Sequence, residues 1–108
     1  MNKEKTLEIN FADPKFLDIL KALSSVTRLN LLKNFLNNNY MCQVAQKLNQ
    51  TESNISLQMK VLEEAGLVNA RFEPGRHGRR KFVKLNFEQI IIHLNFDSGT
   101  GKVESEGI

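Results

Sequence analysis

The chain has few of the residues that mark disulfide-rich or membrane proteins. Its 108 residues include one cysteine, no tryptophan and two prolines. A single cysteine excludes an internal disulfide framework, which fits a protein of a reducing compartment. No apolar run approaches the roughly 18 residues of a membrane span, and the charged N-terminus precedes no apolar signal-peptide core. We therefore expect one cytoplasmic domain with a modest hydrophobic core and no membrane contact.

The sequence also lacks the residue groupings that catalysis requires. It contains no glycine-rich phosphate loop, no set of histidine, acid and nucleophile, and no paired carboxylates in an apolar context. The acidic residues lie in segments that we expect to be exposed helix surface or chain terminus. We therefore expect neither enzymatic activity nor a bound cofactor.

One basic segment is present, and it surrounds residues that form turns. Gly75 and Gly78 lie between two stretches of strand-like alternation, which predicts a two-stranded β-hairpin. From Arg71 to Lys84, six basic side chains accompany one acid, Glu73. Such a hairpin suits contacts to DNA phosphates or to a narrow minor groove, although a solvated charged turn is the alternative. The candidate contact residues in this segment are Arg76, His77, Arg79, Arg80 and Lys81.

The stretch from Asn49 to Gly66 has a polar first half and an apolar second half. Met59, Leu62 and Ala65 recur at helical spacing, and Gly66 can adopt the left-handed conformation that ends many helices. A helix that is buried along one stripe and polar at its N-terminal end is suited to reading base edges in a major groove. Alternatively, the polar side chains cap the helix or are solvated. The candidate contact residues are Thr51, Ser53, Asn54, Ser56, Gln58 and Lys60.

Three helices are predicted before this one. The first begins at Asp13-Pro14, where Asp can accept from free backbone amides and Pro is preset for the first helical position. Ser24 or Ser25 then caps a second helix that carries a broad apolar face. The third helix spans Tyr40 to Leu48, and a turn of a few residues joins it to the polar helix. Two short helices across such a turn have helix-turn-helix spacing.

The remaining chain completes the expected architecture. We predict a last helix from Phe87 to about Asn95, because Ile90, Ile91 and Leu94 are apolar and Asn86 can cap it. Residues 1–12 are expected to form an N-terminal arm and residues 97–108 a disordered tail. The fold class is therefore mainly α with a two-stranded β wing. It is a winged helix-turn-helix domain over residues 13–96, with about five helices.

Four segments of this sequence form a recognisable set: LKALSSVTRL (residues 20–29), VAQKL (44–48), SNIS (53–56) and MKVLEEAGLV (59–68). They resemble the ArsR/SmtB family of winged helix-turn-helix repressors. The likeness covers roughly residues 16–86 and implies a domain that binds operator DNA as a dimer. It also implies that the homodimer is joined mainly through the first and last helices.

The chain departs from the family at the positions of its metal ligands. Metal-sensing members commonly carry Cys-Val-Cys at the start of the third helix, where this chain has Tyr40, Met41 and Cys42. Another family site uses Asp and His ligands on the last helix, where this chain offers His93 and, four residues on, Asp97. Because zinc sites need about four ligands, we expect no metal. Cys42, near a helix N-terminus, is a possible redox-reactive thiol, with an ordinary small helix residue as the alternative.

Three residues retain two interpretations each. Many relatives carry a pair of histidines where this chain has Leu57 and Gln58, so the resemblance implies no particular operator sequence. Leu57 either touches a thymine methyl group or packs against the protein. Gln58 can engage adenine with two hydrogen bonds or be solvated. Arg28 anchors either a DNA phosphate or an internal acid.

These features together predict a sequence-specific DNA-binding transcriptional regulator. The preferred interpretation is a dimeric repressor that lacks the usual metal ligands of the family, with double-stranded DNA as its partner. One alternative is a winged helix that serves as a protein-interaction module. The other is a thiol-responsive repressor that uses Cys42.

Overall fold

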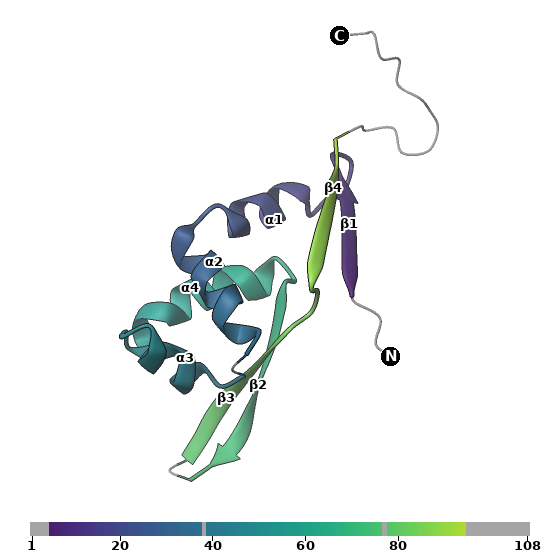
Figure 1. Ribbon diagram of the computed structural model, residues 1–108. Coiled ribbons are helices and arrows are strands. Elements are labelled where there is room, and N and C mark those ends of the chain that lie inside the picture. Colours follow the sequence, from purple (N-terminus) through teal and green to yellow (C-terminus); the bar gives the residue numbers. More distant parts are fainter. Residues whose placement is uncertain (1–4, 38, 77, 95–108) are drawn as a thin grey trace, which may run out of the picture.

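The computed structural model describes residues 5–37, 39–76 and 78–94. The described chain forms four helices, which follow the strand β1 (Thr6–Asn10): α1 (Phe16–Leu23), α2 (Val26–Phe35), α3 (Met41–Lys47) and α4 (Glu52–Glu64). An antiparallel hairpin of β2 (Val68–Gly75) and β3 (Gly78–Leu85) follows, and we call it the wing. The strands β1 and β4 (Gln89–His93) form a second, parallel sheet (Figure 1). The predicted winged helix-turn-helix fold is confirmed, with four helices in the described part of the chain.

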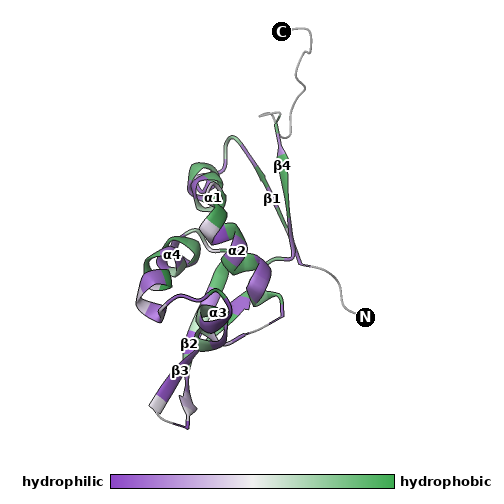
Figure 2. Ribbon diagram, turned by 60° about the vertical axis from the view of Figure 1, so that its left-hand side comes forward, coloured by the Kyte–Doolittle hydropathy of each residue, from purple (hydrophilic) through white to green (hydrophobic). Residues whose placement is uncertain are grey.

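One hydrophobic core joins the helices to the base of the wing. Every helix and the base of both wing strands contribute fully or nearly fully buried side chains to it. The distal part of the wing is mainly hydrophilic, whereas β4 is mainly hydrophobic (Figure 2). The largest fully buried side chains are Phe35, Leu31, Ile55, Met59, Leu62, Val44 and Val83. Because α4 supplies three of these, the helix predicted to read DNA is fixed rigidly to the domain.

The predicted last helix is wrong, because its residues form the strand β4. Residues Gln89–His93 pair in parallel with β1, so that Leu7 lies opposite Ile90 and Ile9 opposite Ile92. Three consecutive isoleucines favour extended backbone because β-branched side chains lose rotamer freedom in a helix. The segment expected to form an N-terminal arm contains the partner strand β1, in which Ile9 is buried. Neither strand reveals its partner in the local sequence, since the pairing joins the two ends of the domain.

The predicted start of the first helix is displaced by two residues. The helix begins at Phe16, after an N-cap residue, Lys15, that makes no side-chain capping bond. Asp13 instead forms the turn before the helix, where its carbonyl accepts from the Phe16 amide at 3.0 Å and its Oδ1 accepts from the Lys15 amide at 3.3 Å. The predicted cap of the second helix is confirmed, because Ser25 Oγ accepts from the Arg28 amide at 3.2 Å.

Candidate nucleic-acid interface

A tight turn between α3 and α4 sets the helix-turn-helix. Asn49 adopts a left-handed conformation with φ of 59°. The Asn49 amide donates to the Gln46 carbonyl at 3.0 Å, and the Gln50 amide donates to the Ala45 carbonyl at 2.9 Å. These two bonds close the C-terminus of α3 as a Schellman motif, in which an asparagine replaces the more usual glycine. The chain therefore leaves α3 in a fixed direction and enters α4 three residues later.

Both ends of α4 are closed by hydrogen bonds of its own chain. At the N-terminus, Thr51 Oγ1 accepts from the Asn54 amide at 3.1 Å. At the C-terminus, Gly66 has φ of +80°, and the amides of Gly66 and Leu67 donate to the carbonyls of Glu63 and Leu62, both at 3.0 Å. The predicted left-handed role of Gly66 is thus confirmed, and the helix ends where the sequence indicates.

The two faces of α4 differ sharply in burial. Ile55, Met59 and Leu62 are fully buried against the core. On the opposite side, Ser53 and Leu57 are exposed, and the side chain of Leu57 is 71% exposed. Leu57 therefore does not pack against the protein. The outward stripe of α4 is available to a partner, and at its centre lies a leucine.

Several predicted contact residues on α4 already have hydrogen-bond partners within the protein. Thr51 caps the helix, and Ser56 Oγ donates to the Glu52 carbonyl one turn earlier at 2.8 Å. Gln58, which is half-buried, accepts at Oε1 from Arg28 Nη1 at 2.6 Å. Among the predicted contact residues on α4, the exposed ones for which the structure gives no such partner are Ser53, Asn54 and Lys60.

Arg28 pairs with backbone carbonyls and an amide, and not with an acid, within the described structure. Its guanidinium donates from Nε to the Ala22 carbonyl at 2.8 Å and from Nη2 to the Lys21 carbonyl at 3.0 Å. These are carbonyls at the C-terminus of α1, where a cation is favourable. Through its third bond, to Gln58, Arg28 ties the end of α1 to the middle of α4.

The wing is joined to the helices by the segment between α2 and α3. Asn39 forms a pair of hydrogen bonds with Val83 on β3: the Val83 amide donates to the Asn39 carbonyl at 2.7 Å, and Asn39 Nδ2 donates to the Val83 carbonyl at 2.9 Å. The next residue, Tyr40, packs its ring edge-on against Phe82 at a centroid distance of 5.5 Å. Its hydroxyl donates to Glu73 Oε1 at 2.9 Å. The orientation of the wing is therefore linked to the start of α3.

This arrangement raises the pKa of Tyr40 above its ordinary value of 10.0, first through the hydrogen bond to Glu73 and also through burial and the negative charge of Glu73. As pH rises, the unfolded chain releases this proton before the folded protein does. Tyr40 should therefore stabilise the fold fully below its unfolded pKa, and this contribution should be lost as pH rises through the folded pKa. Because Tyr40 is the single tyrosine, tyrosinate absorbance reports it alone.

We expect the folded protein to titrate at higher pH than the urea-unfolded chain. The variant Glu73→Gln, which removes the negative charge, should lower the folded pKa towards the unfolded one. Equal titration curves for the folded and unfolded protein would contradict the Tyr40–Glu73 bond.

Three arginines of the wing lie over aromatic rings on its two faces. On one face, the guanidinium carbons of Arg71 and Arg80 lie 4.4 Å from the Phe82 ring centre and 3.9 Å from that of Tyr40, respectively. On the other face, the Arg79 guanidinium carbon lies 4.4 Å from the centre of the Phe72 ring. Stacking of this kind holds a guanidinium in place while it keeps its charge. These three guanidiniums are therefore positioned by the protein.

Two cations of the wing, Arg71 and Lys81, also pair with acids. Arg71 Nη2 lies 2.9 Å from Glu73 Oε2, and Lys81 Nζ lies 3.5 Å from Glu63 Oε2 on α4. The second pair attaches the wing to the C-terminal half of α4. Arg76 is exposed at the tip of the wing, and His77 lies outside the described residues.

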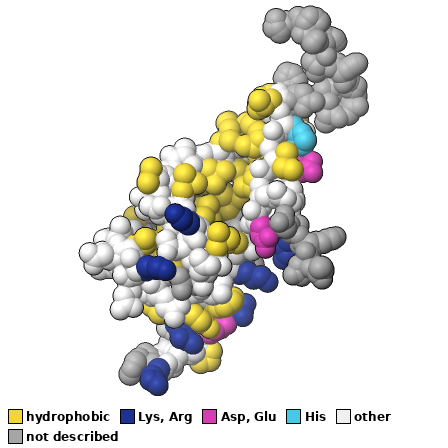
Figure 3. Space-filling view, viewed as in Figure 1, with side chains coloured by type: hydrophobic (Ala, Val, Ile, Leu, Met, Phe, Trp, Pro, Cys, Tyr) yellow, Lys and Arg dark blue, Asp and Glu magenta, His cyan; other side chains and the backbone are white. Residues whose placement is uncertain are grey.

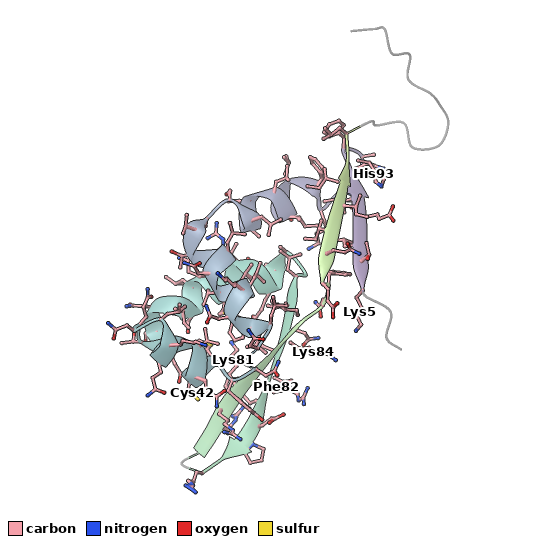
Figure 4. The ribbon with its side chains drawn as sticks, in the orientation of Figure 1. Lys5, Cys42, Lys81, Phe82, Lys84 and His93 are labelled. Carbon is pink, nitrogen blue, oxygen red and sulfur yellow. The ribbon has the colours of Figure 1, made fainter. Side chains whose placement is uncertain are left out.

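A groove of about 490 Å³ separates the wing from the N-terminal ends of α3 and α4. Its walls come from three segments that are distant in sequence, and Figure 4 shows Cys42 of α3 beside Lys81 and Phe82 of the wing. The groove brings two groups of predicted residues together, because Ser56 of α4 faces Arg76, Arg79, Arg80 and Lys81 across it. One acid, Glu52, lies among them. The remaining lining residues are Met41, Cys42, Phe72, Gly75 and Gly78.

The family model for bacterial regulatory proteins of the arsR family matches residues 13–70 of this chain. The matched segment runs from the turn before α1 through α4 into β2 and so contains the whole helix-turn-helix. The chain belongs to the ArsR family. As a member of this family, it is a DNA-binding transcriptional regulator.

A solved structure supports the same assignment. HlyU from Vibrio cholerae N16961 superposes with a TM-score of 0.57 at 29% sequence identity, over 66% of this chain and 74% of the HlyU chain. A search of curated proteins gave no match.

The sequence did not predict one basic cluster of this ArsR-family protein. A hollow of about 230 Å³ at the base of the wing is lined by Lys5, Arg71 and Lys84 together with Asn69 and Asn86. Figure 4 shows Lys5, at the start of β1, and Lys84, on β3, on the same side of the wing. Lys5 is held there because its carbonyl accepts from the amides of Glu88 and Gln89 at 2.8 and 3.3 Å. No local pattern indicates this cluster, since it depends on the pairing of β1 with β4.

The positions that correspond to metal ligands in ArsR-family sensors are spread over the structure. Cys42 is exposed at the groove beside the wing, whereas His93 lies at the end of β4, with its Nε2 2.9 Å from Glu8 Oε1. Asp97 lies outside the described residues. Within residues 5–37, 39–76 and 78–94, no three His, Cys, Asp or Glu side chains are grouped closely enough to hold a metal ion. Over the same ranges, no helix has the length and apolar composition needed to cross a bilayer.

Proposed function

We propose that this protein is a dimeric repressor that places α4 in the major groove of its operator and the wing along the adjacent backbone. The observation that carries the proposal is the groove that Glu52 and Ser56, in the N-terminal half of α4, line together with the cationic wing. Helix and wing are fixed to one core, so both can be presented to a duplex without reorganisation. A repressor of this kind acts in the cytoplasm, where its DNA is.

The predicted contact residues divide into two kinds. Ser53, Asn54 and Lys60 project from the exposed surface of α4 and are suited to base edges or flanking phosphates. Thr51, Ser56 and Gln58 hold the helix and its neighbours in place through internal hydrogen bonds. The wing residues suited to phosphate contacts are Arg76, Arg79, Arg80 and Lys81, with His77 expected beside them.

The dimer is proposed to form at the end of the domain opposite the wing tip. The resemblance to the ArsR/SmtB family implies pairing through the first and last helices. Since the expected last helix is the strand β4, we propose that α1 pairs together with the β1–β4 sheet. Large apolar side chains are exposed there, including Leu17 at 72% and Leu94 at 72%. Figure 3 shows hydrophobic side chains gathered around this end, whereas Lys and Arg lie mainly over the helices and the wing. A two-fold through this end would place two α4 helices in successive major grooves, about 34 Å apart.

Binding to promoter DNA from the protein's own locus tests the proposal. Fluorescence anisotropy should show tighter binding to this DNA than to a scrambled duplex, with affinity falling steeply as salt increases. Sedimentation should give a dimer, and a double variant Leu17→Asp, Leu94→Asp should give a monomer with much weaker DNA binding. Equal affinity for scrambled DNA at every salt concentration would overturn the proposal and favour a winged-helix protein-interaction module.

The substitution Cys42→Ser tests whether the protein is instead a thiol-responsive repressor. Cys42 is exposed at the same groove, so a modified thiol would face the DNA. If an oxidant releases the wild-type protein from DNA but not the Cys42→Ser variant, the thiol regulates binding. If both respond alike, it does not.

A further inference from the structure

We propose that Leu57 is a specificity-determining residue of this regulator, which contacts the C5-methyl group of a thymine in the operator. The inference rests on the proposed function and deepens it, because it names the base feature at the centre of the contact.

The position of Leu57 follows from the burial of its helix. Ile55, Met59 and Leu62 define the buried stripe of α4. At about 100° per residue, Leu57 lies on the opposite side of the helix, directly away from the core. Ser53, one turn earlier, lies on the same outward stripe. A helix that enters a major groove with this stripe forward presents Leu57 at the centre of its contact surface.

The polar neighbours of Leu57 are less available for base reading than their sequence suggests. Ser56 donates back to the Glu52 carbonyl, and Gln58 is held by a hydrogen bond from Arg28 of α2. Oε1 already accepts from a guanidinium at 2.6 Å, which holds the Gln58 amide towards Arg28 and makes it less free to take up the usual two-bond arrangement with adenine. Readout by α4 is therefore moved from the amide of Gln58 to the apolar side chain beside it.

The major groove offers Leu57 one chemical partner. Every base edge there presents hydrogen-bond donors or acceptors, except for the methyl group of thymine. A leucine against a polar edge would desolvate that edge without replacing its hydrogen bonds. A leucine against a methyl group removes apolar surface from water on both sides. An exposed leucine elsewhere on a protein needs no explanation, but here it occupies the middle of the surface that faces the bases.

A thymine-to-uracil scan of the footprinted operator tests this inference, because it removes one methyl group at a time. At one position in each half-site, uracil should weaken wild-type binding by roughly three- to tenfold. At the same position, cytosine should also weaken binding, and 5-methylcytosine should recover part of the loss. The Leu57→Ala variant should bind the thymine operator about as weakly as the wild type binds the uracil operator, and it should be insensitive to uracil and to 5-methylcytosine.

The outcomes separate this inference from the proposed function. Specific binding in which no single uracil affects the wild type, or in which uracil affects wild type and Leu57→Ala equally, would overturn the role of Leu57 and leave the repressor proposal intact. Absence of specific binding to any duplex would overturn both.

Discussion

Substituting both Arg79 and Arg80 with Glu is expected to lower the affinity for operator DNA by about a hundredfold or more at moderate salt. Each substitution removes a cation next to the groove and introduces an anion that repels phosphate. The effect should be large because both guanidiniums are positioned by aromatic stacking, Arg79 on Phe72 and Arg80 on Tyr40. A cation that is already ordered loses less side-chain entropy when it meets a phosphate.

The salt dependence of binding gives a second readout of the same change. If the two arginines neutralise phosphates, neutral substitution with Gln should reduce the slope of log affinity against log salt by about two per protomer. A matched control reverses Lys21 and Lys33, which are exposed on α1 and α2, so that the net charge changes equally away from the groove. Because Lys21 lies one turn from Leu17, sedimentation must show that this control remains a dimer. If this control weakens binding as much as the wing variant does, general charge and not the wing attracts the DNA.

Substituting Leu62 with Ala is expected to lower the free energy of unfolding by about 2–5 kcal/mol. Leu62 is fully buried, and it supports α4 from the core side. Its loss would leave a cavity beneath α4, among side chains that can relax only partly. Since domains of this size are stable by only about 5–15 kcal/mol, a substantial fraction of the protein should unfold at moderate temperature. Urea denaturation followed by circular dichroism measures the change.

The same substitution five residues earlier provides the control. Leu57→Ala removes an identical group from the same helix, but this side chain is 71% exposed. Its unfolding free energy should change by no more than about 0.5 kcal/mol, although its DNA recognition should change. If Leu57→Ala destabilised the protein as much as Leu62→Ala, the assignment of the two faces of α4 would be wrong.

Local signals in the sequence were sufficient for the helix-turn-helix. Gly66 ends α4 with the left-handed conformation that a glycine adopts readily, and Ser25 and Thr51 cap their helices as short hydroxyl side chains do. The wing also follows from nearby residues, since Gly75 and Gly78 pair across its tip. In each case the residues that cause the local structure lie within a few positions of one another, so the sequence alone is sufficient to predict it.

The sequence by itself thus determined the family, the helix-turn-helix, the wing and the outward polar end of α4. Only the tertiary structure decided which of these polar side chains are free, because Arg28 reaches Gln58 from another helix. It also decided that Ile90, Ile91 and Ile92 form a strand. Their β-branched side chains favour extended backbone, but only β1, from the other end of the chain, provides the hydrogen bonds that a strand needs. The exposure of Leu57 was likewise decided only by the tertiary structure. An apolar residue on a helix is either core or contact surface, and only the packing of the other elements distinguishes the two.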